Sequence, residues 1–237
     1  MKKHIPNLIT CCNGLLGAIS VVFALKGFFE TAVVLIICAA VFDFLDGFLA
    51  RYLKVQSLIG KDLDSLSDIV SFGVAPAAIL FVWMGFCFTN LPHEWQFFPL
   101  TLLPYFAFII VPFSAYRLAR FNNDTRQQDF FYGLPTPANA FFIAFLPFAA
   151  DHLPFLDNFW VLMSITLVFS ILLVSEFPMF SLKFSSLTFK KNWVRYLFLF
   201  LSAILLIAFQ LAAFPLIILL YILISLILMG LTKVIHQ

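Results

Sequence analysis

The chain has 237 residues, of which 63% are hydrophobic and only 11% are charged, and its formal net charge is +2. A compact soluble domain has too little interior to bury that much apolar surface, so this composition excludes a soluble globular protein. It predicts an all-α membrane protein that crosses the bilayer several times.

Hydrophobic stretches recur along the whole chain. A helix needs about 20 residues, most of them apolar, to cross the roughly 30 Å hydrocarbon core of a membrane. On that criterion we predict eight spans, over residues 8–26, 30–53, 62–88, 98–119, 136–152, 158–181, 194–212 and 214–233. We therefore expect a helical bundle of about eight transmembrane helices that forms one integral membrane domain over residues 1–237.

The first span and the distribution of basic residues predict the orientation. Lys2 and Lys3 precede an apolar run, as in a signal sequence, but Pro6 and Asn7 interrupt that run, so we expect no cleavage. With an even number of spans, both termini share one side of the membrane with every Lys and Arg except Lys26. The positive-inside rule places that side in the cytoplasm. We expect a multi-pass protein of the cytoplasmic membrane, in contact with membrane lipids.

The second and third spans carry four aspartates: Asp43, Asp46, Asp64 and Asp68. The members of each pair are three or four residues apart and share a helix face, and the short connection over residues 52–59 predicts antiparallel neighbouring helices. An ionised aspartate at the centre of a spanning helix costs roughly 2.5–3.5 kcal/mol, so four of them need a compensating cation. We predict a divalent-metal site that faces the cytoplasm.

Carboxylates alone suit a hard cation such as Mg²⁺, Mn²⁺ or Ca²⁺, and two divalent ions would balance four aspartates, as in two-metal phosphoryl-transfer sites. The neighbouring residues fit a phosphate ligand. Gly47, Ala50 and Gly60 are small and allow close approach, and the guanidinium of Arg51 matches phosphate geometry. The alternative is that the aspartates cap helices or form ion pairs with Arg51.

Polar residues in the other spans have simpler interpretations. Thr10 and Asn13 could border the ligand site, although Asn13 could equally form a hydrogen bond between helices. Glu176, late in the sixth span, is predicted to pair with Lys183. Three residues fit helix caps or the membrane interface better than ligands: Asn122, Thr136 and Asn139.

The pattern D-x2-D-G-x2-A-R-x8-G-x3-D-x3-D is satisfied at every fixed position from Asp43 to Asp68. It resembles the signature of the CDP-alcohol phosphatidyltransferases. Flanking segments at residues 6–13, 64–77, 116–122 and 133–137 resemble the phosphatidylserine synthase branch of that family. The resemblance covers about residues 4–150, which we expect to form the catalytic core, and residues 155–237 then add further transmembrane helices.

The resemblance implies a role for each residue of the motif. Asp43, Asp46 and Asp64 match the metal ligands of the family, and Asp68 matches the fourth ligand, which also acts as the general base. The positions that line the CDP and pyrophosphate pocket are matched by Gly47, Ala50, Arg51 and Gly60. The implied reaction transfers a phosphatidyl group from CDP-diacylglycerol to L-serine and releases CMP, with two Mg²⁺ or Mn²⁺ ions.

The acceptor site lies outside the motif. A serine carboxylate calls for an arginine near Asp68, and Arg117 and Arg120 share a face at the cytoplasmic end of the fourth span, with Arg120 the first candidate. Both could instead be ordinary cytoplasmic anchors. Other acceptors, glycerol 3-phosphate or inositol phosphate, stay open, as does a divalent-cation or proton-coupled transporter. We expect a homodimer and no nucleic-acid partner.

Overall fold

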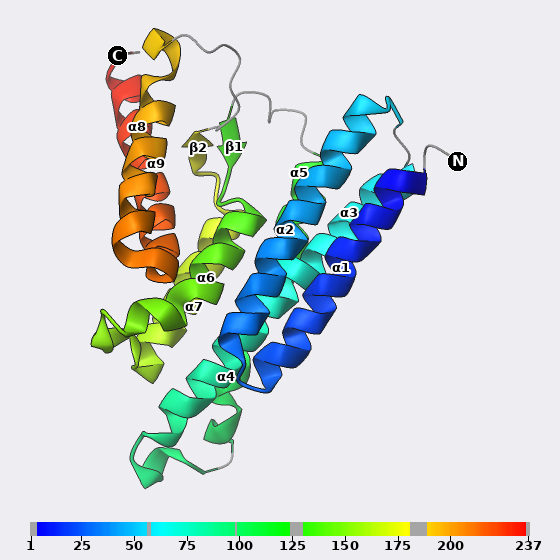
Figure 1. Cartoon of the computed structure of the whole chain (residues 1–237). Coiled ribbons are helices and arrows are strands. Elements are labelled where there is room, and N and C mark those ends of the chain that lie inside the picture. Colours follow the sequence, from blue (N-terminus) through cyan, green and yellow to red (C-terminus); the bar gives the residue numbers. More distant parts are fainter. Residues whose placement is uncertain (1–3, 56–57, 98, 124–129, 181–188, 236–237) are drawn as a thin grey trace.

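The computed structural model describes residues 4–55, 58–97, 99–123, 130–180 and 189–235, most of them helical (Figure 1). The α-helices are α1 (His4–Leu25), α2 (Phe29–Tyr52), α3 (Leu58–Asp68), α4 (Ala75–Thr89), α5 (Ile110–Asn123), α6 (Thr136–Ala150), α7 (Phe159–Val174), α8 (Phe189–Phe209) and α9 (Ala213–Ile235). The shorter elements are the π-helical segment η1 (Ile69–Val74), the 3-10 segments η2 (His93–Trp95), η3 (Leu100–Ile109), η4 (Pro154–Leu156) and η5 (Gln210–Ala212), and the strands β1 (Phe130–Tyr132) and β2 (Pro178–Phe180).

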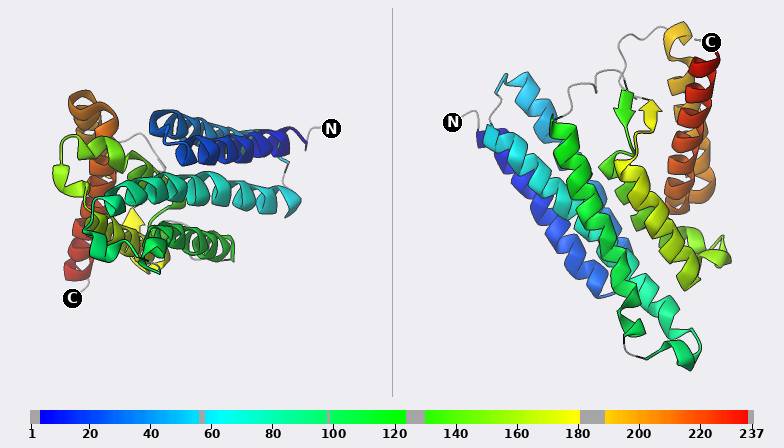
Figure 2. Two further views of the ribbon diagram at one scale, coloured as in Figure 1. Left: turned by 90° about the horizontal axis from the view of Figure 1, so that it is seen from below. Right: turned by 180° about the vertical axis from the view of Figure 1, so that it is seen from behind.

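Each predicted span contains a helix at the expected place, which confirms the predicted all-α class. Five stretches of the described chain are long and apolar enough to cross a membrane, and the last of them, Asn192–Met229, combines α8 and α9. Helices α6 and α7 are apolar but shorter, with 15 and 16 residues. The start of α1 and the end of α9 lie toward the same end of the molecule (Figures 1 and 2), as an even number of crossings requires. The number of crossings and their orientation stay predictions.

The sixth predicted span is wrong at its C-terminal end. It was expected to continue to residue 181, but α7 ends at Val174 and Ser175 is already extended, with ψ of 156°. Pro178 begins β2. Proline has no backbone N–H to donate and disfavours a helical conformation in the residue before it, so the helix ends ahead of this position.

A small antiparallel sheet pairs β1 with β2, and Phe130 lies opposite Phe180. The sequence does not predict it, because three residues show too little alternation to indicate a strand. Gly133 follows β1 with a φ of 78°, and a Cβ at this position would lie 2.5 Å from the carbonyl oxygen of Leu173. The turn from the sheet into α6 therefore depends on glycine.

Helices α3 and α4 are joined through η1 into one helical stretch over residues 58–89, which begins four residues before the predicted third span. Its π-helical middle directly follows Asp68. Pro76 accounts for the irregular turn, because it has no N–H to bond the carbonyl of Phe72 and its ring crowds that carbonyl. Ser71, within η1, donates from Oγ to the carbonyl oxygen of Asn13 in α1 at 2.9 Å.

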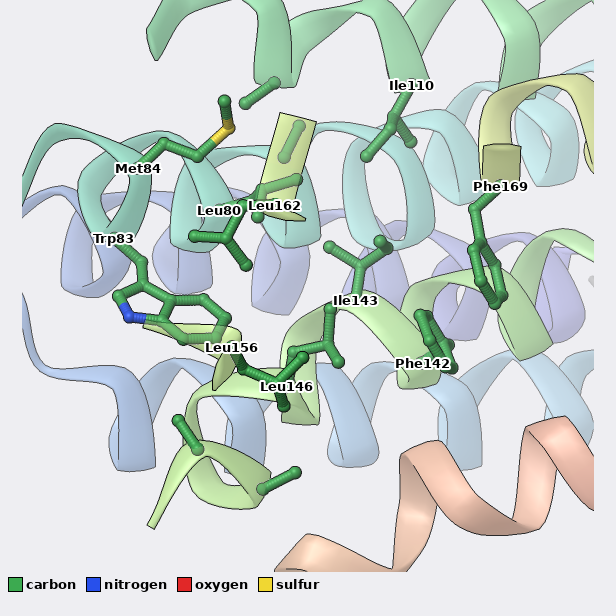
Figure 3. Close-up of a cluster of buried hydrophobic side chains, with 14 of the residues drawn as sticks. Leu80, Trp83, Met84, Ile110, Phe142, Ile143, Leu146, Leu156, Leu162 and Phe169 are labelled. Carbon is green, nitrogen blue, oxygen red and sulfur yellow. The ribbon is translucent and has the colours of Figure 1, made fainter. Parts of the chain in front are cut away.

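Two apolar clusters hold the helices together. The larger includes Leu80 and Trp83 of α4 and joins them to residues of α5, α6, α7 and α9 (Figure 3). The smaller joins α1, α2, η1, α4 and α6 around Phe72 and Phe145. The ring of Phe145 also stacks on that of Phe214 in α9, with centroids 4.1 Å apart. Helix α6 thus connects the first five helices to the C-terminal pair.

Candidate metal centre

Three of the four predicted aspartates meet between α2 and α3. Asp43, Asp64 and Asp68 each offer a carboxylate oxygen, and these oxygens lie within 4.8 Å of one another. Asp46 is not part of that cluster, but it lies one turn beyond Asp43 on α2 and is buried. The structure therefore brings three predicted ligands together and places the fourth beside them.

None of the four carboxylates forms a salt bridge with any residue that the structure describes. The Oδ2 atom of Asp46 and the Oδ1 atom of Asp64 are buried and have no hydrogen-bond partner. Like charges gathered away from water are unfavourable unless a cation joins them. The alternative of an ion pair with Arg51 thus has no support, and the oxygen-only donor set fits a hard divalent cation such as Mg²⁺ or Mn²⁺.

Helix α1, which the predicted hairpin did not include, packs along both α2 and α3. The Nδ2 atom of Asn13 donates to Oδ1 of Asp68 at 3.1 Å, so the interhelical interpretation of Asn13 is correct and its partner is the proposed base. Helix α1 and the segment η1 approach each other closely, since a Cβ added at Gly17 would lie 2.3 Å from Oγ of Ser71. From the sequence, a single asparagine in an apolar helix indicates that a polar partner exists but not which residue it is.

The residues predicted to bind pyrophosphate lie on both helices beside the carboxylates. Arg51 is exposed, and its Nη1 and Nη2 atoms lie 4.0 Å from the position that a Cβ of Gly47 would occupy. Ala50 is half-buried on the same helix, and Gly60 is half-buried on α3, one turn before Asp64. This arrangement leaves the guanidinium of Arg51 accessible to a ligand.

Arg117 is a buried residue of α5. Its Nη1 atom donates to Oγ1 of Thr136 at 3.4 Å, whereas its Nε atom is buried without a partner. The guanidinium carbon lies 5.1 Å from the ring centroid of Phe121. Arg117 is therefore a buried positive group with one donor still unpaired.

Arg120 points elsewhere, although it was the first candidate for the serine carboxylate. Its Nη2 atom forms an ion pair with Oε1 of Glu176 at 2.7 Å, and its Nη1 atom donates to the carbonyl oxygen of Val174 at 3.2 Å. Lys183, the partner expected for Glu176, lies outside the described residues. Arg120 links α5 to the segment after α7, and its guanidinium is already occupied.

Asn122, at the end of α5, holds that helix against α3. Its Nδ2 atom donates to Oγ of Ser65 at 2.7 Å, and its carbonyl oxygen accepts from Nζ of Lys61 at 2.6 Å. The side chain of Asn122 thus joins two helices and does not cap one. Thr10 donates within α1, to the carbonyl oxygen of Pro6 at 3.0 Å.

Comparison with known proteins gives a consistent family assignment. The family model described as CDP-alcohol phosphatidyltransferase matches residues 3–174. A CDP-diacylglycerol–serine O-phosphatidyltransferase from Helicobacter pylori is 33% identical over 155 residues, which cover 65% of this chain and 61% of the relative. One of the same name from Mycobacterium leprae is 34% identical over 186 residues, 74% of this chain and 57% of the relative. An archaetidylserine synthase from Methanothermobacter thermautotrophicus is 33% identical over 138 residues, 57% and 54% of the two chains. The matches thus span less than two thirds of the length of these relatives.

Proposed function

Because this chain belongs to the CDP-alcohol phosphatidyltransferase family, we propose that it transfers a phosphatidyl group from CDP-diacylglycerol to the hydroxyl group of L-serine and releases CMP. The observation that carries this proposal is the meeting of Asp43, Asp64 and Asp68 within 4.8 Å, at positions of the family motif. The names of the relatives support serine as the acceptor. Nothing in these comparisons supports the transporter alternative.

The metal ligands in this proposal are Asp43, Asp46, Asp64 and Asp68. They would hold two Mg²⁺ or Mn²⁺ ions, which would supply positive charge to the phosphate oxygens. The unpaired buried oxygens of Asp46 and Asp64 fit this role, since each has a lone pair free for a cation. The protein itself contributes the spacing of the carboxylates, which α1 fixes through its contacts with both helices.

Asp68 acts as the general base. The side-chain amide of Asn13 binds Oδ1 of Asp68, which fixes the carboxylate and leaves Oδ2 for the proton of the serine hydroxyl. As that proton moves to Asp68, the serine oxygen bonds to the phosphorus that carries diacylglycerol, and the bond from this phosphorus to CMP breaks. Such positioned proton transfer contributes about 10²–10⁴-fold to a rate.

The leaving group is held on the α2 side. Arg51 can bind two phosphate oxygens with its guanidinium, and Gly47, Ala50 and Gly60 have no long side chain to keep the nucleotide from the backbone. The charge that develops on CMP as the bond breaks is therefore stabilised by a fixed cation.

The acceptor carboxylate is assigned to Arg117 in preference to Arg120. Arg117 is buried and has an unpaired Nε atom. Arg120 already pairs with Glu176. We therefore expect the carboxylate of the acceptor amino acid to bind Arg117.

The proposed location is the cytoplasmic membrane, with the metal centre facing the cytoplasm, because the basic residues of the chain fall on the side of the aspartates. A homodimer is part of the proposal and is tested by the mass of the purified protein in detergent, corrected for bound detergent. A monomeric mass would refute the dimer without affecting the proposed reaction.

The central test uses the purified full chain in detergent with CDP-diacylglycerol, Mg²⁺ or Mn²⁺, and radiolabelled L-serine. We expect labelled phospholipid and CMP in equal amounts, loss of both on chelation, and recovery when the metal is restored. Glycerol 3-phosphate and inositol phosphate are run in parallel, and faster transfer to either would reassign the acceptor. Absence of CMP release with all three acceptors would refute the proposed reaction.

A further inference from the structure

Several polar side chains are buried among α5, α6 and α7 without the partners that burial normally requires. Asn139 is fully buried, and neither its Nδ2 nor its Oδ1 atom has a hydrogen-bond partner, so its predicted role as a helix cap or interfacial residue is wrong. The hydroxyl groups of Ser114 and Ser170 are also fully buried and unpaired, as is Nε of Arg117. Unpaired buried polar groups are costly and rare, so four residues of this kind indicate a place where a polar ligand binds.

Helical spacing puts the α5 and α6 residues on facing sides. Ser114 lies one turn before Arg117 on α5, and Asn139 lies one turn after Thr136 on α6. The hydrogen bond from Arg117 to Thr136, at 3.4 Å, joins these two faces. Asn139 is therefore within a turn of the residue that Arg117 contacts.

The polar cluster adjoins one end of the larger apolar core along the chain. Ile110, Phe142 and Phe169 occupy the end of that core opposite Trp83 (Figure 3). Ser170 directly follows Phe169, and Asn139 lies one turn before Phe142. The rings of Phe142 and Phe169 stack with centroids 3.7 Å apart, which holds α6 against α7 next to Asn139 and Ser170 in the chain.

Ser114 connects the cluster to the helical stretch that carries the proposed base. The Cβ atom of Ser114 lies 3.5 Å from the position that a Cβ of Gly73 would occupy, and Gly73 is in η1, which begins directly after Asp68. A ligand held by the cluster would thus lie about one helical turn along from the carboxylate that takes the acceptor proton.

The donors and acceptors of the cluster match a zwitterion. The guanidinium of Arg117 can bind a carboxylate, whereas the Oδ1 atom of Asn139 and the serine hydroxyls can accept hydrogen bonds from an ammonium group. An amino acid with a hydroxyl group presents both charges. Glycerol 3-phosphate and inositol phosphate have no ammonium group and carry more negative charge than one arginine balances.

We infer that Asn139, assisted by Ser114 and Ser170, binds the ammonium group of the acceptor amino acid while Arg117 binds its carboxylate. The inference rests on the proposed function and adds the residues that distinguish an amino acid from other alcohols. With both charged groups held, the hydroxyl of the acceptor is directed toward Asp68.

The test compares acceptors that each lack one charged group. Asn139→Leu removes both polar atoms at similar volume, and we expect kcat/KM for L-serine relative to 3-hydroxypropanoate, which lacks the ammonium, to fall about tenfold or more. Arg117→Leu should instead lower the preference for L-serine over ethanolamine, which lacks the carboxylate. The thermal midpoint of Asn139→Leu should stay unchanged or rise, because an unpaired buried amide is removed.

Thr166→Val is the matched control, since Thr166 is fully buried one turn before Ser170 and its hydroxyl bonds Leu162 within its own helix at 2.7 Å. It should leave both preferences unchanged. The inference is overturned if active Asn139→Leu protein keeps the wild-type preference for L-serine over 3-hydroxypropanoate. It is also overturned if kcat/KM falls equally for these two acceptors. If that variant does not fold, Asn139→Ser is measured by the same ratio. Failure of the wild-type protein to use serine would instead refute the proposed acceptor.

Discussion

Gly17→Ala tests how tightly α1 must pack for the metal centre to work. The added Cβ would lie 2.3 Å from Oγ of Ser71 and 2.7 Å from its Cα atom. The hydroxyl can rotate away, but the Cα atom belongs to the backbone of η1. Ordinary carbon contacts begin near 3.4 Å, so the helices must separate by roughly 0.7 Å at this point.

The consequence should reach the base, because Asn13 lies one turn before Gly17 and donates to Asp68. Overpacking of this kind costs about 1–3 kcal/mol of stability. A displacement approaching 1 Å in a catalytic arrangement can cost up to about 10²-fold in rate. We expect a lower thermal midpoint in detergent and a fall in kcat of roughly 10- to 100-fold.

Two further alanine substitutions complete the series. Gly85→Ala, on α4, meets nothing within 4 Å and should be neutral or slightly stabilising. Gly14→Ala meets Oγ of Ser67 at 3.0 Å, a side-chain atom that can move, so its effect should be intermediate. The measurements are the melting curve and the initial rate of CMP release. A Gly17→Ala protein indistinguishable from Gly85→Ala would refute the reasoning.

Further substitutions test the individual roles. Asp43→Asn, Asp46→Asn and Asp64→Asn should each weaken metal binding, so that added Mg²⁺ recovers part of the activity. Normal turnover of these variants at a low metal concentration would contradict this role. Asp68→Asn should lower transfer by about 10²–10⁴-fold while CDP-diacylglycerol still binds, and lost donor binding would make it chiefly a ligand. Arg117→Lys should raise KM for serine but not for the donor, because lysine lacks the planar fork of arginine. Arg120→Lys should change the serine KM less, since Arg120 pairs with Glu176; the reverse order would restore Arg120 as the carboxylate partner.

Hydropathy predicts the helices well because each needs a long apolar run, and such runs stand out in a single sequence. It fails where the backbone departs from regular helix over a few residues. Pro178 ends the sixth span early, and Pro76 produces a π-helical turn without interrupting the apolar pattern. The strands β1 and β2 are too short for their pairing to be detected.

The candidate site was predictable to the extent that it is local. The motif places two carboxylates on each of two adjacent helices, and the structure brings three of them together. Contacts from distant parts of the chain were not predictable, such as that of Asn13 with Asp68. Spacing alone put Arg117 and Arg120 on one face, but their partners, Thr136 on α6 and Glu176 after α7, separate them.

The short strand β2 has a consequence for the last helix. Each strand of a two-stranded sheet has one edge whose backbone N–H and C=O groups are unpaired, and apolar surroundings offer these groups no hydrogen bonds. Here α9 supplies hydrogen bonds to the edge of β2. Tyr221 donates to the carbonyl oxygen of Phe180 at 2.9 Å, and Oγ of Ser225 accepts from the N–H of Phe180 at 3.4 Å. Helix α9 thus covers the open edge of the sheet in addition to packing its apolar side chains. A truncation before it would expose this edge to pairing with another chain, so shortened versions of the protein should aggregate through β2.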